Sequence, residues 1–395
     1  MNIKKTLKKL LFYIVLLLAF HGSGQTIPTD SAVAYPQSLT DSVKIGDTTF
    51  FYQKQGIDKI VSRIDTTLLI NNQEMTLTYK SFSLNDYCYK TPNDIDTTDK
   101  SNIKKYISVT SNNQYCFTFK SQNKVVSTTY ISKKDFEKFR DNIIRCSVPI
   151  APVLVGYSAC RNSFLFKLWF GLMNSDVADN YFVVLDNKGS IVLKDFNNFN
   201  FGGHPELQIS NDGKYFISGS GLYDFTKQIV PFKANPLYCT FIDNNNVLVF
   251  NDFVTSKDTI ISLGSENGKE ITSRTQTSHV DTLTDDAYIY NVSGKIIKTF
   301  KFHGESAFGM GDPSPLIQKV DQLNRFIFFD AIRKIVYSLN PGDVSNIEIE
   351  NLSTVEKVEK PLEKTTGFVA VEFQYFKKII LYYQNGTLEK YFMEN

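Results

Sequence analysis

Acidic side chains are the residues of this sequence best suited to catalysis or metal binding, and the chain has 41 of them. Asp94, Asp96 and Asp99 lie close together in NDIDTTD, and Asp285 is followed directly by Asp286. A calcium loop alternates its oxygen ligands in the pattern D-x-[DN]-x-[DN]-G, and NDIDTTD holds only a fragment of it. We therefore interpret NDIDTTD as a solvated acidic turn. A glycosidase would use two carboxylates, but the sequence does not show which two.

Histidine and serine give no stronger indication of chemistry. Beyond the N-terminal region, the histidines are His204, His279 and His303, which lack the i, i+4 spacing of a metal-binding pair on a helix. Ser306 follows His303 in HGES, but a nucleophile elbow needs G-x-S-x-G and Phe308 stands at its last position. We interpret each histidine as a structural residue. The sequence assigns no catalytic, cofactor-binding or metal-binding residue, and we expect no cofactor.

The five cysteines allow two interpretations. In an oxidising compartment the pairs nearest in sequence, Cys88–Cys116 and Cys146–Cys160, could form disulfides, and Cys239 would be left over. Alternatively, most of the cysteines are small buried residues on strands, as the segments YCFTF and YCTFI indicate. We favour the second interpretation. Because the sequence contains no C-x-x-C, it predicts neither a zinc knuckle nor a redox pair.

Basic and acidic residues are nearly balanced, with 43 lysines and arginines against 41 acidic residues and a net charge of +2. Such a balance produces no general field that would attract nucleic acid. The sequence also has no G-x-G-x-x-G or P-loop pattern for binding phosphates. The GSG at residues 219–221 is better explained as a tight turn between strands. We therefore expect no nucleic-acid partner.

Residues 1–24 have the three parts of a secretory signal peptide. Four lysines precede an apolar run at residues 10–20, and Gly22 and Gly24 occupy the −3 and −1 positions of a cleavage site before Gln25. The apolar run is shorter than the ~20 residues that span a bilayer, so we expect no integral membrane segment after cleavage. No cysteine follows the run, which argues against a lipid-anchored protein. We expect the mature protein in the periplasm or outside the cell.

Most of the remaining chain is predicted to form strands. Residues 25–48 are rich in Thr, Ser, Asp and Pro and are predicted to be a flexible lead-in. From residue 49 onward, short runs rich in Phe, Tyr, Ile, Val and Thr alternate with turn residues, which is typical of a sandwich, barrel or propeller. One short helix is predicted near residues 132–145, where Ser132 and Asp135 have the spacing of a capping box.

A hairpin of two strands around a turn recurs along the chain. Four spacings between its copies lie between 38 and 48 residues, close to the period of ~40–50 residues for propeller blades. We therefore predict an all-β propeller of six four-stranded blades, with seven blades or a stack of β-sandwiches as alternatives. It would span residues 49–395, with an irregular part at 49–147 and clearer blades at 148–395. The copies are VVLDNKGSIVLK (Gly189), GLYDFTKQIVPF (Lys227), TIISLGSENGKEI (Gly268), YIYNVSGKIIKTF (Gly294), KIVYSLNPGDVSNIEI (Gly342) and IILYYQNGTLEKYF (Gly386).

Two stretches resemble known propeller repeats. Residues 294–339 combine a Gly-led strand, a loop with Gly and Pro, and two strands that end near Asp330, and this pattern resembles the repeat of NHL-type and related six-bladed propellers. Residues 209–225, ISNDGKYFISGSGLYDF, are similar to the blade core of WD40-like and YVTN-like propellers. The resemblance covers residues 180–392 and implies a β-propeller. We also expect the C-terminal strands IILYY and LEKYF to close the ring against strands near residues 49–80.

A propeller without a recognisable catalytic constellation favours a binding or scaffolding role. We expect an exported bacterial protein that presents a protein or glycan ligand site where the blade loops converge. The alternative is a secreted carbohydrate-active enzyme, a glycosidase or lyase, that uses carboxylates in the channel. A third interpretation is a structural component of a surface complex.

Overall fold

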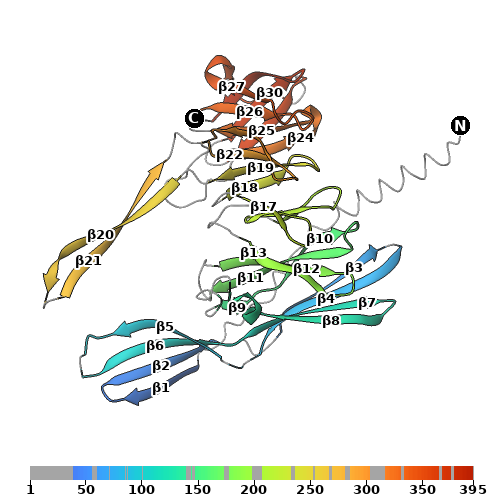
Figure 1. The fold of residues 1–395 in the computed structure, drawn as a ribbon. Coiled ribbons are helices and arrows are strands. Elements are labelled where there is room, and N and C mark those ends of the chain that lie inside the picture. Colours follow the sequence, from blue (N-terminus) through green and yellow to red (C-terminus); the bar gives the residue numbers. More distant parts are fainter. Residues whose placement is uncertain are drawn as a thin grey trace. The chain divides into compact units, whose positions relative to one another are not determined.

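The computed structural model shows an all-β chain whose strands are grouped into separate sheets (Figure 1). Leu39–Asn395 form one compact unit. The predicted signal peptide lies outside the residues that the structure describes, whereas part of the predicted lead-in, Leu39–Ile45, forms a strand. The structure describes residues 39–394 except 56–59, 71, 85, 87, 100, 139–143, 145–146, 173–177, 198–206, 233–235, 252–253, 267–268, 281–284, 303–315, 331–332, 364–366 and 375–377.

Six sheets follow one another along the chain, and we number them as blades 1 to 6. Blade 1 contains β3 (Ile60–Ile70), β4 (Gln73–Ser83), β7 (Asn113–Ser121) and β8 (Lys124–Ser132); blade 2 contains β10 (Val153–Ser158), β11 (Ser163–Leu172), β12 (Ala178–Asp186) and β13 (Ile191–Asn197), with β9 (Ser147–Pro149) pairing with β11. Blade 3 contains β14 (Gln208–Ile209), β15 (Phe216–Ser218), β16 (Gly221–Tyr223) and β17 (Gln228–Pro231); blade 4 contains β18 (Pro236–Phe241), β19 (Asn246–Asn251), β22 (Ala287–Asn291) and β23 (Ile296–Phe300). Blade 5 contains β24 (Leu316–Val320), β25 (Arg325–Asp330), β26 (Ile335–Leu339) and β27 (Ile347–Asn351); blade 6 contains β28 (Glu356–Val358), β29 (Val369–Gln374), β30 (Lys378–Gln384) and β31 (Thr387–Met393). The described 3-10 helices are η1 (Lys133–Phe136), η2 (Asp321–Leu323) and η3 (Leu352–Thr354).

Two further groups of strands are inserted into this series. The inserted sheet has the order β1-β2-β6-β5, from β1 (Leu39–Ile45), β2 (Thr48–Gln55), β6 (Ile103–Thr110) and β5 (Tyr89–Asp96), and its β2 and β6 are parallel. The inserted hairpin consists of β20 (Val254–Glu266) and β21 (Lys269–Val280). The β5–β6 hairpin and the β20–β21 hairpin both interrupt a blade between its second and third strands.

Five buried hydrophobic clusters hold the blades together, and each cluster joins two blades that are consecutive in the chain. Phe182 of blade 2 lies against Phe216 and Tyr223 of blade 3, with ring centroids 5.1 and 5.0 Å apart. A blade between two neighbours buries both of its faces, so its central strands are continuous apolar runs such as RFIFFD in β25. These packed four-stranded sheets confirm the predicted all-β propeller fold.

Side-chain oxygens shape the turns of the repeated hairpins. Asp186 Oδ1 accepts hydrogen bonds from the backbone N–H groups of Lys188 (2.9 Å) and Ser190 (2.7 Å). This Asx-type turn requires a residue with positive φ, which is Gly189 at +83°. Gly221 has a different role, because a Cβ there would lie 2.2 Å from the Val230 carbonyl oxygen. The structure thus confirms that the GSG at residues 219–221 is a tight turn between β15 and β16.

The structure corrects the repeat count at one position. The copy around Gly268 belongs to the inserted hairpin and not to a blade, so the interval from Lys227 to Gly294 is 67 residues (294 − 227). The part that we expected to be irregular, residues 49–147, contains blade 1 and most of the inserted sheet. At the predicted helix, the described residues form the short helix η1, and Asp135 accepts a hydrogen bond from the Ser132 N–H (2.9 Å) as the capping box requires.

Blade 6 takes its outermost strand from an earlier segment of the chain. Its order is β28-β31-β30-β29, and β28 runs parallel to β31. Among the described strands, β30 and β31 pair only within this blade, so the expected pairing with strands near residues 49–80 is not found there. The expected ring closure stays a prediction.

Candidate functional site

The residues that we considered for nucleophilic or metal chemistry fall largely outside the described part of the chain. His204, His303 and Ser306 are not described, and His279 is described only as a backbone position of β21. Among the described residues, no group of three His, Cys, Asp or Glu side chains is arranged to hold a metal ion. The described helices include none that is long and apolar enough to cross a membrane.

The acidic turn after β5 uses its carboxylates to shape the backbone. Asp96 accepts hydrogen bonds from the N–H (3.0 Å) and Oγ1 (2.6 Å) of Thr98. Asp99 accepts equivalent bonds from the N–H (2.9 Å) and Oγ (2.7 Å) of Ser101. The hydroxyl hydrogen bonds, followed by those from the backbone, hold the pKa of both carboxyls below the usual value. These contacts agree with a solvated acidic turn.

A buried acid cluster connects blades 4 and 5 and includes carboxylates that the sequence analysis named. Asp286 precedes β22 and is 5% exposed, while Asp330 ends β25 and is fully buried. Arg333 donates to Asp330 Oδ2 (Nε, 2.5 Å), to the Lys301 carbonyl (3.0 Å) and to the Tyr337 hydroxyl (2.8 Å). Asp286 Oδ1 accepts a hydrogen bond from the Phe302 N–H (2.5 Å). The cluster therefore fixes the end of blade 4 to blade 5.

Burial determines how this cluster binds protons. The pKa of Asp286 is raised to about 7, chiefly because burial desolvates the carboxylate; nearby Asp330 also raises it, while the Phe302 N–H and Arg333 act in the opposite direction. Asp286 can therefore exchange a proton near neutral pH. Because both carboxylates lie in the interior, the pair does not have the open cleft that a glycosidase needs for its substrate. We assign the cluster a structural role.

The described cysteines include both buried and exposed residues, and none of them is in a disulfide. Cys116 and Cys239, the cysteines of YCFTF and YCTFI, are 3% and 5% exposed and confirm the prediction of small buried residues. Cys88 and Cys160 are exposed. The suggested pair Cys88–Cys116 is not formed, and Cys160 is a free thiol. Cys146 lies outside the described residues.

A buried lysine lies where the inserted sheet meets blade 1. Lys133 is fully buried, and its Nζ donates to the Ser147 carbonyl at 2.9 Å and lies 4.6 Å from the centre of the Tyr89 ring. Tyr89, the first residue of β5, donates its hydroxyl hydrogen to Glu137 Oε1 at 2.5 Å. A buried ammonium needs such partners because its charge is otherwise costly to desolvate. Lys133 therefore fastens the inserted sheet to blade 1.

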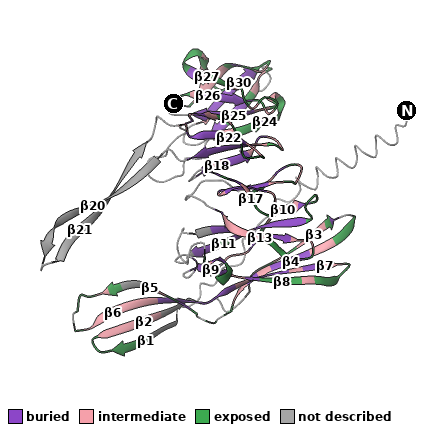
Figure 2. Cartoon of the chain, in the orientation of Figure 1, coloured by how far each residue is buried: buried purple, intermediate pink, exposed green. Residues whose placement is uncertain are grey.

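Most described residues of the inserted sheet are intermediate or exposed (Figure 2), and none of them belongs to a described core cluster. Strand register places Val43 and Phe50 opposite each other, then Phe50 beside Lys105, and Lys105 opposite Ile95. Residues paired in this way project from the same face of a sheet. We call this the apolar face; its described side chains include Val43, Ile45, Phe50, Tyr52, Lys90, Ile95, Ile103, Lys105 and Ile107.

The apolar face combines exposed aliphatic groups with rings that carry lysines. Val43 is 47% exposed, Ile45 63% and Ile95 55%, although such residues are usually covered. The ammonium of Lys105 lies 5.6 Å from the Phe50 ring centre, and that of Lys90 lies 5.5 Å from the Tyr52 ring centre. Cation–π attraction of this kind holds the lysine stems along the sheet.

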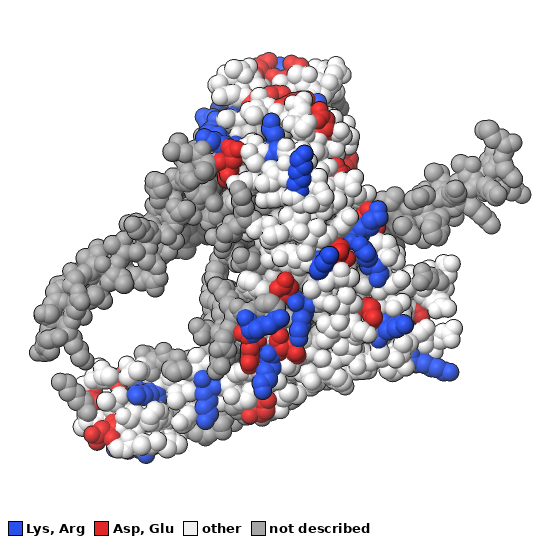
Figure 3. Space-filling view, in the orientation of Figure 1, with Lys and Arg blue, Asp and Glu red and all other residues white. Residues whose placement is uncertain are grey.

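This face was not found from the sequence, because its first strand lies in the segment that we predicted to be a flexible lead-in. The available signal was the alternation on either side of the turn in SVKIGDTTFFY at residues 42–52, where Val43 and Ile45 alternate before Gly46 and Asp47, and Phe50 and Tyr52 alternate after them. Elsewhere, on the side of the molecule shown in Figure 3, basic and acidic side chains are intermingled.

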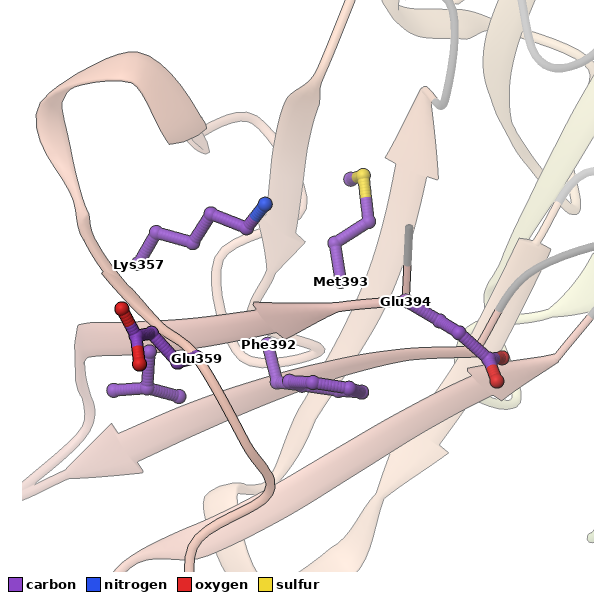
Figure 4. A pocket seen from close by; sticks show the side chains of 6 residues that line it. Lys357, Glu359, Phe392, Met393 and Glu394 are labelled. Carbon is purple, nitrogen blue, oxygen red and sulfur yellow. The ribbon is translucent and has the colours of Figure 1, made fainter.

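A pocket of about 680 Å³ lies at the end of β28 and β31 in blade 6 (Figure 4). It is lined by Lys357, Glu359 and Glu394 together with Val358, Phe392 and Met393. The Glu394 carboxylate points away from Lys357 in Figure 4 and accepts a hydrogen bond from the Lys378 N–H (3.2 Å). Because its charged groups do not converge on one point, we assign no ligand to this pocket.

Comparisons with known proteins provide no functional assignment. No family model matches the chain, and no curated protein matches it. Among solved structures, the chain is similar to a chain in the crystal structure of a nidogen/laminin complex (9% identity, TM-score 0.25, covering 71% of this chain and 94% of that one). It is also similar to the periplasmic gluconolactonase PpgL of Pseudomonas aeruginosa (9%, 0.21, 69% and 81%) and to a protein of unknown function from Bacteroides thetaiotaomicron (10%, 0.25, 74% and 71%). These likenesses are too distant to carry an argument, and the fold assignment rests on the sheets described above.

Proposed function

We propose that this protein is an exported, non-catalytic binding or scaffolding protein that contacts a macromolecular partner through the apolar face of the inserted sheet. The observation that carries the proposal is the exposure of Val43, Ile45 and Ile95 on one face of a sheet that joins none of the described cores. Exposed apolar patches of this kind mark interaction surfaces. A protein partner fits better than a glycan, because aliphatic side chains offer a sugar little hydrogen bonding.

Export is the second part of the proposal and rests on the signal-peptide pattern of residues 1–24. Expression with the native N-terminus is expected to give a soluble product that begins at Gln25. N-terminal sequencing of the periplasmic and medium fractions measures this. A product that keeps Met1 in a membrane fraction would contradict export.

The alternative of a carbohydrate-active enzyme receives no support from the described carboxylates. Asp286, whose pKa is raised by burial, and the neighbouring Asp330 are buried and held by the Phe302 N–H and Arg333. A substrate would have to enter the interface between two blades to reach it.

Site-specific photo-crosslinking in the producing cell tests the binding role. A photoreactive residue at Val43 lies on the apolar face, and the same residue at Lys44 lies on the opposite face of the same exposed strand. We expect adducts of higher mass from position 43 and few from position 44. Equal adducts at both positions, or none at position 43, would overturn the use of this face.

A further inference from the structure

We infer that the partner of the apolar face is a second copy of this chain, so that two inserted sheets pack face to face as a β-sandwich. This inference rests on the proposed use of the apolar face and names its occupant. The apolar side chains of this face gain stability when another apolar surface removes them from water. None of the described residues of β1, β2, β5 or β6 belongs to the five core clusters.

The shape of the face fits another sheet. Its exposed groups lie on the edge strands β1 and β5, and half-buried side chains of the central strands β2 and β6 lie between them, so together they form a broad surface and not a groove. Two sheets that pack in this way lie ~10 Å apart and interdigitate the side chains of their inner faces. A second copy supplies a sheet of the same size with the same apolar residues, and twofold pairs are the commonest form of protein self-association.

Charges at the two ends of the inserted sheet are complementary. The turns at one end carry the exposed residues Asp47 and Asp99, and the Ile103 N–H donates to the Asp47 carbonyl (2.8 Å), which places both turns at this end. The other end carries exposed Lys90 on β5. If the strands of the two copies run antiparallel across the sandwich, β5 of one copy lies over β5 of the other, and Asp99 of each copy approaches Lys90 of the other. A face-to-face pair with this polarity gains attraction at both ends.

The size of the face sets the expected affinity. Four strands ~4.8 Å apart, with about seven residues each at ~3.3 Å, give a face of roughly 19 by 23 Å. Covering it in both copies removes on the order of 900 Å² of surface, which is below the ~1,200 Å² of stable interfaces and within the range of weak, transient ones. We therefore expect a reversible dimer with a dissociation constant on the order of 10 µM, and not a permanent one.

Sedimentation velocity of residues 25–395 between about 1 and 100 µM, a range that brackets the expected dissociation constant, tests the inference. The wild type is expected to shift from monomer to dimer across this range. Val43→Asp introduces a charge on the apolar face and is expected to stay monomeric, while Ser42→Asp, on the opposite face of the same strand, is expected to dimerise as the wild type does. Circular dichroism of each variant checks that the fold is retained.

A charge exchange tests the arrangement of the two copies. Lys90→Glu is expected to weaken the dimer about tenfold at low salt, and the double variant D99K/K90E is expected to restore it. A wild type that remains monomeric at the highest concentration, equal effects of Val43→Asp and Ser42→Asp, or a double variant without rescue would each overturn the inference. If the wild type is monomeric while position 43 still crosslinks to another protein in the cell, the proposed binding role stands and the second copy is excluded as the partner.

Discussion

Blade 5 and the inserted sheet are built from similar residues but are buried very differently. In β25, five of six residues are buried, because Phe326 and Phe328 pack toward blade 4 while Ile327 and Phe329 pack toward blade 6. In β2, Phe50 and Tyr52 are only half-buried, although they too are large β-formers. The difference shows that strand composition specifies a sheet, whereas the neighbouring sheets specify how much of it becomes core.

The largest expected effect is in the two-sided core. Phe328 is fully buried, with the rings of Phe250, Phe300, Phe302 and Tyr337 between 5.5 and 5.8 Å away. Phe328→Ala is expected to lower the free energy of unfolding by about 3–5 kcal/mol, because it leaves a cavity among rigid rings. Urea denaturation measures the loss. A cost below about 1 kcal/mol would mean that blades 4 and 5 are not held by this cluster.

The next effect depends on pH and concerns the contact between blades 4 and 5. The pKa of Asp286 is about 7 in the folded protein and near the usual 3.8 in the unfolded chain. Between these values the unfolded chain releases the proton while the folded protein keeps it, so this group lowers stability as pH rises from 4 to 7. The asparagine of the Asp286→Asn variant cannot ionise. The free energy of unfolding of this variant is therefore expected to exceed that of the wild type by up to about 4 kcal/mol above pH 7.

Thermal or urea unfolding at pH 4 and pH 8 measures this difference. The two proteins are expected to differ by less than about 1 kcal/mol at pH 4, because this is close to the pKa of Asp286 in the unfolded chain while the folded protein still keeps the proton. A stabilisation by Asp286→Asn that does not change between pH 4 and pH 8 would mean that the proton is not involved.

A smaller effect is expected where the inserted sheet meets blade 1. Lys133→Ala removes the donor to the Ser147 carbonyl and the cation over the Tyr89 ring. We expect a loss of about 2 kcal/mol and faster hydrogen exchange in β5, because a buried acceptor loses a charged partner. Lys134→Ala is the matched control, since Lys134 is the exposed neighbour. Equal exchange in the two variants would show that Lys133 does not fasten the inserted sheet.

The smallest effect on stability is expected from an alanine substitution in the inserted sheet. Phe50→Ala in the inserted sheet is expected to cost the dilute protein less than about 1 kcal/mol, because the ring is already partly in water. The same change is expected to weaken self-association at higher concentration. A cost equal to that of Phe328→Ala would mean that the inserted sheet has a core of its own.

Local turn chemistry made the repeated hairpins predictable. The turns at Gly189, Lys227, Gly294, Gly342 and Gly386 all join strands that pair with each other, because Asx-type oxygens and glycine act within a few residues. For the same reason the hairpin around Gly268 was misplaced. A hairpin has the same local sequence whether it belongs to a blade or projects from one.

Contacts between distant segments were not predictable from local pattern. The proximity of Asp286 to Asp330 depends on the packing of two blades, and the apolar face depends on the parallel pairing of β2 with β6, which lie more than 50 residues apart. The predicted helix was correct at Ser132 and Asp135, where the capping contact is local, and the described residues after them form only the short helix η1.

The strand order of blade 6 has a consequence for synthesis. The β28 segment leaves the ribosome about 30 residues before β31, which is its pairing partner in the blade. Chain elongation at ~5–20 residues per second therefore leaves β28 without its neighbour for seconds. The edge of this sheet can be sealed only after β31 has emerged, so blade 6 stays incomplete during this interval.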